Sequence, residues 1–154
     1  MRQGLALLAG CLIALSDAAA SNMVITPDRE RPLIHALYAL GVKYRYGGNS
    51  HEEGFDCSGL VTHVYGQAWG ITLPRSVDEQ RHVGTPVRLK ELAPGDLIFY
   101  NTRNRPYSHV GIYVGNGFFV HAPRPGAKVR IESVQTPYWR ERFNGARRLD
   151  PPTF

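Results

Sequence analysis

The chain has 154 residues, of which 43% are hydrophobic, and this length and composition predict one domain with its own core. The 16 glycines and 11 prolines are scattered between apolar runs, which excludes a long low-complexity tract. The 18 basic residues exceed the 13 acidic ones and favour an anionic partner, but they form no groove-reading motif, so we expect no nucleic acid.

Residues 1–20 have the layout of a secretory signal peptide, with an early arginine, an apolar run and small residues at the end. We expect cleavage after Ala20 and export to the periplasm or cell envelope, because the run is shorter than the ~20 residues that span a bilayer. A competing route stays open, since residues 8–11 resemble a lipoprotein lipobox that would place a lipid anchor on Cys11. Either route leaves Cys57 as the only free thiol, and an unpaired cysteine in an oxidising compartment indicates a chemical role.

Two helices are predicted after this leader. The spacing of apolar residues predicts an amphipathic helix over about 27–40, with Gly41 as its stop. A second helix is predicted to begin at Cys57, because Asp56 is a favoured N-cap, and to end at Gly70. The cysteine therefore lies in the first turn of a helix. The residues expected to line the apolar faces are Leu33, Ile34, Leu37 and Leu40 in the first helix and Leu60, Val61, Val64 and Ala68 in the second.

The segments around the second helix contain turn signals. Residues 42–48 predict a short extended piece that ends at paired glycines, with a loop after it through Gly54. Ser76 and Glu79 form a capping box, which predicts a short third helix up to about Val83.

The second half of the chain changes to short apolar runs broken by glycine, proline and asparagine, which predicts an antiparallel sheet. A helical turn near 138–143 and an edge strand near Arg147 complete an α+β domain in which helices precede strands. We place this domain at residues 29–150, after a short segment 21–28 and before a tail 151–154. The other predicted strands are 96–100, 107–114, 118–121 and 129–131.

Cys57 has the setting of a nucleophile. A thiol attacks a carbonyl only as its thiolate, and a free cysteine is mostly protonated near neutral pH. The unpaired N–H groups and positive dipole end of a helix N-terminus lower a thiol pKa. We therefore predict that the pKa of Cys57 is lowered by its position, with Gly59 allowing close approach of the backbone.

A nucleophilic thiol also needs an imidazole that takes its proton and later passes it to the leaving group. His109 and His121 lie on consecutive predicted strands joined at residues 115–117. Their side chains share a face if the connection is a three-residue loop, or if a two-residue Asn-Gly turn is compensated by a bulge. We predict that His109 is the base and that His121 orients it by fixing its tautomer. The opposite face, with Ile112 and Val114, should pack on the helix of Cys57.

Zinc binding is an alternative use of the same three side chains. The sequence has no paired ligands at short spacing, so we expect no metal and no cofactor. The remaining histidines are interpreted as surface residues without partners; they are His35, His51, His63 and His82.

Four ordered motifs resemble those of NlpC-like cysteine peptidases, over about residues 29–150. The resemblance implies a papain-like α+β fold and amide hydrolysis through an acyl-enzyme, with Cys57, His109 and His121 as catalytic residues. The motifs are FDCSGLV at 55–61, PGDL at 94–97, SHVGIY at 108–113 and FVHA at 119–122.

Three further segments, 44–48, 73–76 and 137–139, resemble Spr-type murein endopeptidases. This resemblance implies cleavage of peptide stems in peptidoglycan. We expect the protein to be a monomer. The implied bond is the D-alanyl to diaminopimelyl crosslink, with the γ-D-glutamyl to diaminopimelyl bond as runner-up. By the same resemblance the Tyr44 hydroxyl helps to hold the oxyanion. We predict Asp56, Ser58 and Arg75 as further oxyanion- or substrate-binding residues.

A non-enzymatic function stays open: a wall-binding module that uses Arg75, Arg124 and Arg130 to hold stem carboxylates. The presence of the cysteine and both histidines favours the enzyme. Comparison of peptidoglycan clearing by the wild type and by a variant without the thiol separates the two.

Overall fold

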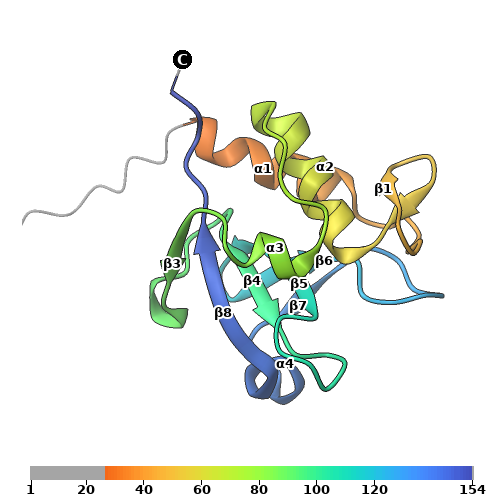
Figure 1. Cartoon of the computed structure of the whole chain (residues 1–154), viewed down its shortest axis with the longest axis vertical. Coiled ribbons are helices and arrows are strands. Elements are labelled where there is room, and N and C mark those ends of the chain that lie inside the picture. The colour runs from red at the N-terminus through yellow and green to blue at the C-terminus, as the bar shows by residue number, and fades with distance from the viewer. Residues whose placement is uncertain (1–26, 154) are drawn as a thin grey trace, which may run out of the picture.

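The computed structural model describes residues 27–153, in which helices pack on an antiparallel sheet (Figure 1). The predicted leader, its cleavage site and Cys11 lie outside the described residues. Within residues 27–153, none of the helices combines the length and the apolar character that crossing a membrane requires. The helices are α1 (Pro27–Tyr38), α2 (Cys57–Trp69), α3 (Val77–Gln80) and α4 (Pro137–Arg142), with a 3-10 turn η1 (Leu89–Glu91).

The predicted α+β class is confirmed. A six-stranded antiparallel sheet has the order β3-β8-β4-β5-β6-β7, and a small hairpin of β1 and β2 stands apart from it. Helices α1 and α2 cover one face of the sheet and α4 packs on the other. The strands are β1 (Asn49–Ser50), β2 (Gly54–Phe55), β3 (Thr85–Val87), β4 (Leu97–Tyr100), β5 (His109–Gly115), β6 (Phe118–His121), β7 (Arg130–Ser133) and β8 (Phe143–Arg148).

Strand β8 is not the edge strand that the sequence predicted. Strand β3 pairs with its outer side, so β8 lies between β3 and β4 (Figure 1). The three-residue β3 contains Pro86, which cannot donate a ladder hydrogen bond and suits an edge. Such a short strand carries little sequence signal, and the same is true of the β1–β2 hairpin within the predicted loop.

The predicted apolar face of α1 is wrong. Ile34 and Leu37 are 50% and 46% exposed, whereas Ala36 and Ala39 are fully buried. The helix packs beside α2, and small alanine side chains allow two helices to approach closely. The indole N–H of Trp69 in α2 donates to the Asp28 carbonyl at 2.7 Å and ties the two helices together.

Helix α2 forms as predicted. Asp56 is its N-cap and accepts the Gly59 N–H at 2.8 Å, and Gly70 ends it with a φ of 68°. The predicted core residues of the helix are buried. Helix α3 is shorter than predicted and ends at Gln80, although the Ser76 side chain accepts the Glu79 N–H as expected.

The turn between β5 and β6 decides which face each histidine occupies. Asn116 and Gly117, both with positive φ, form a two-residue turn, and a register shift before Gly115 makes Val114 a bulged residue. Tyr113 then lies opposite Phe119, so odd-numbered residues of both strands share one face. The compensating bulge, one of the two predicted connections, is confirmed.

Candidate active site

The start of α2 is held by a close backbone contact. The Asp56 N–H donates to the Gly48 carbonyl at 3.1 Å, and a Cβ placed on Gly59 would lie only 2.0 Å from that oxygen. Glycine at 59 therefore allows the loop at Gly48 to pass against the first helical turn. This contact fixes where the loop lies relative to Cys57.

Asp56, Ser58 and Arg75 form a network around the N-terminus of α2. One Asp56 oxygen caps the helix, and the other accepts the Gly47 N–H and the Arg75 guanidinium, each at 2.9 Å. Arg75 also donates to the Ser58 hydroxyl at 2.8 Å. Asp56 and Ser58 are buried, while the Arg75 side chain keeps 41% of its surface exposed. These contacts order the loops; a role in substrate binding stays a prediction.

Cys57 has a free thiol and is partly exposed at the first turn of α2. The backbone N–H groups of Val110 and Ser58 donate toward its sulfur and favour the thiolate. The sulfur therefore lies beside the start of β5, next to His109. A nucleophile here is within reach of both solvent and the histidine strand.

The predicted lowering of the Cys57 pKa is wrong. Burial of the sulfur raises the pKa of Cys57, and the neighbouring Asp56 carboxylate raises it further. These effects outweigh the backbone N–H groups and Arg103, which lower it. The predicted helix effect exists, but the N-cap that starts the helix is itself an anion beside the thiol. The resting thiol is therefore protonated and requires a base.

His109 and His121 meet as predicted. His109 Nε2 and His121 Nδ1 are 2.8 Å apart, and both side chains are buried, at 4% and 0% exposed. The Trp139 ring of α4 stacks on His109, with ring centroids 5.7 Å apart and an angle of 24° between the planes. Because His109 Nε2 is engaged by His121, Nδ1 is the ring nitrogen left for the thiol.

His109 is held in its neutral form. Burial, followed by the nearby His121 and Arg103, lowers the pKa of His109 to about 3. Burial also lowers the pKa of His121, against the opposing effect of Glu132. Near neutral pH both rings are uncharged, so His109 has a lone pair that can accept a proton.

Glu132 is a site residue that the sequence reasoning missed. Its Oε2 lies 2.6 Å from His121 Nε2 and accepts the Arg130 Nε–H at 2.9 Å. The predicted strand ended at residue 131, one position short of it. A strand continued by one residue would have placed Glu132 on the His121 side of the sheet, because Glu132 pairs with Phe119. Arg130, one of three arginines in the wall-binding alternative, is paired here.

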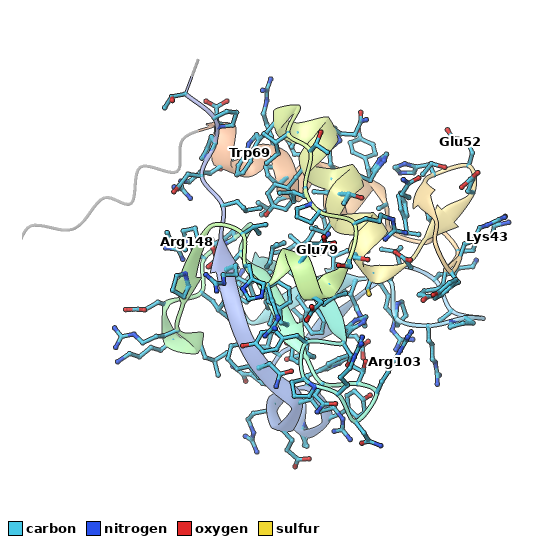
Figure 2. All side chains as sticks on the ribbon, viewed as in Figure 1. Lys43, Glu52, Trp69, Glu79, Arg103 and Arg148 are labelled. Carbon is cyan, nitrogen blue, oxygen red and sulfur yellow. The ribbon has the colours of Figure 1, made fainter. Side chains whose placement is uncertain are left out.

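Tyr44 and Arg103 stand near the thiol from two separate loops. Burial, and then the charge that Cys57 carries as a thiolate, raise the pKa of Tyr44, so its hydroxyl stays a hydrogen-bond donor. The Arg103 side chain hydrogen-bonds to Tyr44 and its charge acts on both Cys57 and His109. Arg103 lies on the loop after β4, on the side of the molecule where α2 begins (Figure 2). No motif marked Arg103 in the sequence.

Two of the histidines interpreted as isolated have partners. The His51 and His63 rings are 4.9 Å apart and both pack on Phe55, and His51 Nε2 lies 3.3 Å from the Tyr38 carbonyl. Among residues 27–153, no group of three or more His, Cys, Asp and Glu side chains is arranged to hold a metal. At the predicted site, both His121 ring nitrogens are already engaged, by His109 and Glu132.

Comparisons with known proteins identify a family and several relatives of this chain. The model of the NlpC/P60 family matches residues 41–148. The murein DD-endopeptidase MepH of Escherichia coli is 43% identical over 119 residues, covering 75% of this chain and 44% of MepH. The gamma-DL-glutamyl hydrolase of Bacillus subtilis is 40% identical over 136 residues, covering 88% of this chain and 31% of the hydrolase.

A solved structure shares the fold. The crystal structure of an NlpC/P60 family protein from Bacillus cereus superposes with a TM-score of 0.73 at 36% identity, covering 80% of this chain and 40% of that one. The chain thus spans less than half the length of these three proteins. The similarity covers the part that contains the cysteine and both histidines.

Proposed function

Because the chain belongs to the NlpC/P60 family, we propose that it is a cysteine peptidase that hydrolyses peptide stems or crosslinks of peptidoglycan. The observation that carries the proposal is a thiol at the start of α2 beside the backbone N–H of Val110 in β5, the strand whose His109 is in hydrogen-bond contact with the buried His121. Cys57 is the nucleophile, His109 the base, and His121 the residue that orients the base.

The protonated resting thiol sets the order of events. His109 Nδ1 takes the proton as the sulfur attacks the scissile carbonyl, and then passes it to the leaving amine. Water hydrolyses the resulting acyl-enzyme with His109 again as base. The Cys57 backbone N–H and the Tyr44 hydroxyl hold the oxyanion, and the raised pKa of Tyr44 supports its role as a donor.

The favoured bond is the D-alanyl to diaminopimelyl crosslink, and the similarity to a murein DD-endopeptidase supports it. The γ-D-glutamyl to diaminopimelyl bond is the second candidate, which the similarity to a gamma-DL-glutamyl hydrolase favours. Stem peptides carry carboxylates. The net charge of +5 and the partly exposed guanidinium of Arg75 suit such a substrate. Mass spectrometry of the released muropeptides distinguishes the bonds.

Zymography on peptidoglycan tests the activity. Wild type should clear the substrate, Cys57→Ala should not, and His82→Ala, a change at an exposed histidine, should clear it like wild type. Equal clearing by wild type and Cys57→Ala, or none by either, refutes the enzyme. Binding of both proteins to insoluble peptidoglycan without clearing would support the wall-binding module instead.

Location and assembly belong to the same proposal. The leader-like residues 1–20 support export to the periplasm or cell envelope, and lipidation of Cys11 is the alternative to cleavage after Ala20. The enzyme acts there as a monomer. The intact mass of the mature protein separates a chain that starts at Ser21 from a lipidated one. Light scattering of the purified protein tests the monomer.

A further inference from the structure

The side chains of His109, His121 and Glu132 form one continuous hydrogen-bonded line that leads away from the thiol. His109 Nε2 meets His121 Nδ1 at 2.8 Å, and His121 Nε2 meets Glu132 Oε2 at 2.6 Å. His121 is fully buried, whereas the Glu132 side chain is 27% exposed. The line therefore runs from the buried base to a carboxylate at the protein surface.

The line follows from the register of three adjacent strands. Ile112 pairs with Val120 and His121 pairs with Arg130, so β5, β6 and β7 present their site residues on one face. The Glu132 carboxylate is held there by the Arg130 guanidinium at 2.9 Å and by the Trp139 side chain. Tyr100 of β4 packs on the same Trp139, and burial, followed by the charge of Glu132, raises the pKa of Tyr100.

We propose that Glu132 is a positioning residue that fixes the tautomers of both histidines and so leaves His109 Nδ1 free to act as the base. The proposal rests on the proposed function. A carboxylate can only accept, so His121 must carry its proton on Nε2. Neutral His121 then has a lone pair on Nδ1, which must accept a proton held on His109 Nε2. His109 Nδ1 is consequently unprotonated.

Without the carboxylate, the opposite pair of tautomers would satisfy the contact between the two histidines equally well. His121 would then carry its proton on Nδ1 and donate it to His109 Nε2, which forces the His109 proton onto Nδ1. A protonated Nδ1 cannot accept the thiol proton. The His121 contact by itself therefore orients the His109 ring but does not choose its tautomer, and Glu132 makes that choice.

Glu132 remains an acceptor over the whole working range of pH. Its hydrogen bond with His121 is the main cause that lowers the pKa of Glu132 to about 2, and Trp139 and Arg130 act in the same direction. The charged and titratable groups that face Glu132 and His121 are Arg130, Tyr100 and His109, and Arg103 acts on His109.

The test compares two replacements in the full chain. Glu132→Leu removes the acceptor, and Glu132→Gln keeps an amide oxygen that can accept from His121. Nitrogen-15 NMR of the imidazoles should show both His109 and His121 protonated on Nε2 in wild type and in Glu132→Gln. Glu132→Leu should show a proton on His109 Nδ1. Glu141→Gln, at an exposed position on α4, is the matched control and should change nothing.

Kinetics on peptidoglycan fragments supply the second readout. General base catalysis is worth about 10²- to 10⁴-fold, so Glu132→Leu should lower kcat by at least about tenfold with little change in KM, and Glu132→Gln should retain most of the rate.

Wild-type tautomers in Glu132→Leu, or a wild-type His109 protonated on Nδ1, overturn the proposal. The second result needs no variant to fold. Because NMR uses no substrate, a wild type that fails to cleave peptidoglycan refutes the proposed function alone.

Discussion

His109 Nε2 and His121 Nδ1 are 2.8 Å apart because a bulged Val114 shifts β5 against β6 until both side chains share a face. A two-residue turn without that bulge would place the rings on opposite faces of the sheet. The same contact buries both imidazoles beneath Trp139, where neither is charged near neutral pH. The turn between the strands thus controls both the geometry and the protonation of the base.

Acid should destabilise the protein through these histidines. The folded pKa of His109 is about 3, far below the ordinary value of 6.5, so between these limits the unfolded chain binds more protons. The stability that this group contributes is present above pH 6.5 and is lost as the pH falls toward 3, with a slope of up to about 1.4 kcal/mol per pH unit. Urea unfolding from pH 7.5 to pH 4 measures it.

His109→Gln removes this titration and should flatten the slope. His82→Gln, at an exposed position, should leave the slope as in wild type. A wild-type free energy of unfolding that stays constant over the range contradicts the assignment of a neutral buried His109.

The thiol should behave as a weakly acidic one. Burial and Asp56 raise the pKa of Cys57, so at pH 7 the sulfur is protonated and its alkylation by iodoacetamide is slow. The rate should rise with pH and continue to rise above pH 9, the ordinary value for this group. A rate that levels off below pH 7 would indicate a thiolate–imidazolium pair at rest and contradict the protonated thiol.

Local signals identified the parts of the site that depend on neighbours in sequence. Asp56 as N-cap and Gly70 as stop predicted α2 and placed Cys57 in its first turn, and strand parity predicted that His109 and His121 meet only through a three-residue loop or a bulge. These features depend on backbone conformation within a few residues, which composition and spacing report directly.

The features that the sequence did not predict depend on packing between distant segments. The buried face of α1 carries Ala36 and not Ile34, because close contact with α2 favours the small residue. The Cys57 pKa is set by how much protein surrounds the sulfur, which no local pattern reports. Glu132 and Arg103 reach the site from a third strand and a loop, so only the tertiary arrangement reveals them.

Arg103 should favour the thiolate of Cys57. Its positive charge lowers the pKa of Cys57, so Arg103→Ala should slow alkylation at pH 8. The side chain is on an exposed loop, so the effect should be about two- to fivefold, the size of an exposed charge interaction, and should shrink in 1 M salt. Arg105→Ala on the same loop is the control and should alkylate at the wild-type rate. An equal change in both variants would assign the effect to the loop and not to the Arg103 charge.

Gly59 and Gly66 lie on the same helix and should respond to alanine in opposite directions. A Cβ at Gly59 would stand 2.0 Å from the Gly48 carbonyl, a backbone atom, so Gly59→Ala must displace the loop or the first turn of α2, at a cost of about 1–3 kcal/mol. The nearest neighbour to a Cβ at Gly66 is the Ile71 carbonyl at 3.8 Å, an ordinary contact, so Gly66→Ala should stabilise the helix by about 0.5–1 kcal/mol. Urea unfolding measures both changes, and alkylation of Cys57 reports whether the first turn has moved. Equal stability of the two variants would mean that the loop at Gly48 moves aside at no cost. The contact between Gly48 and Gly59 would then not hold Cys57 in place.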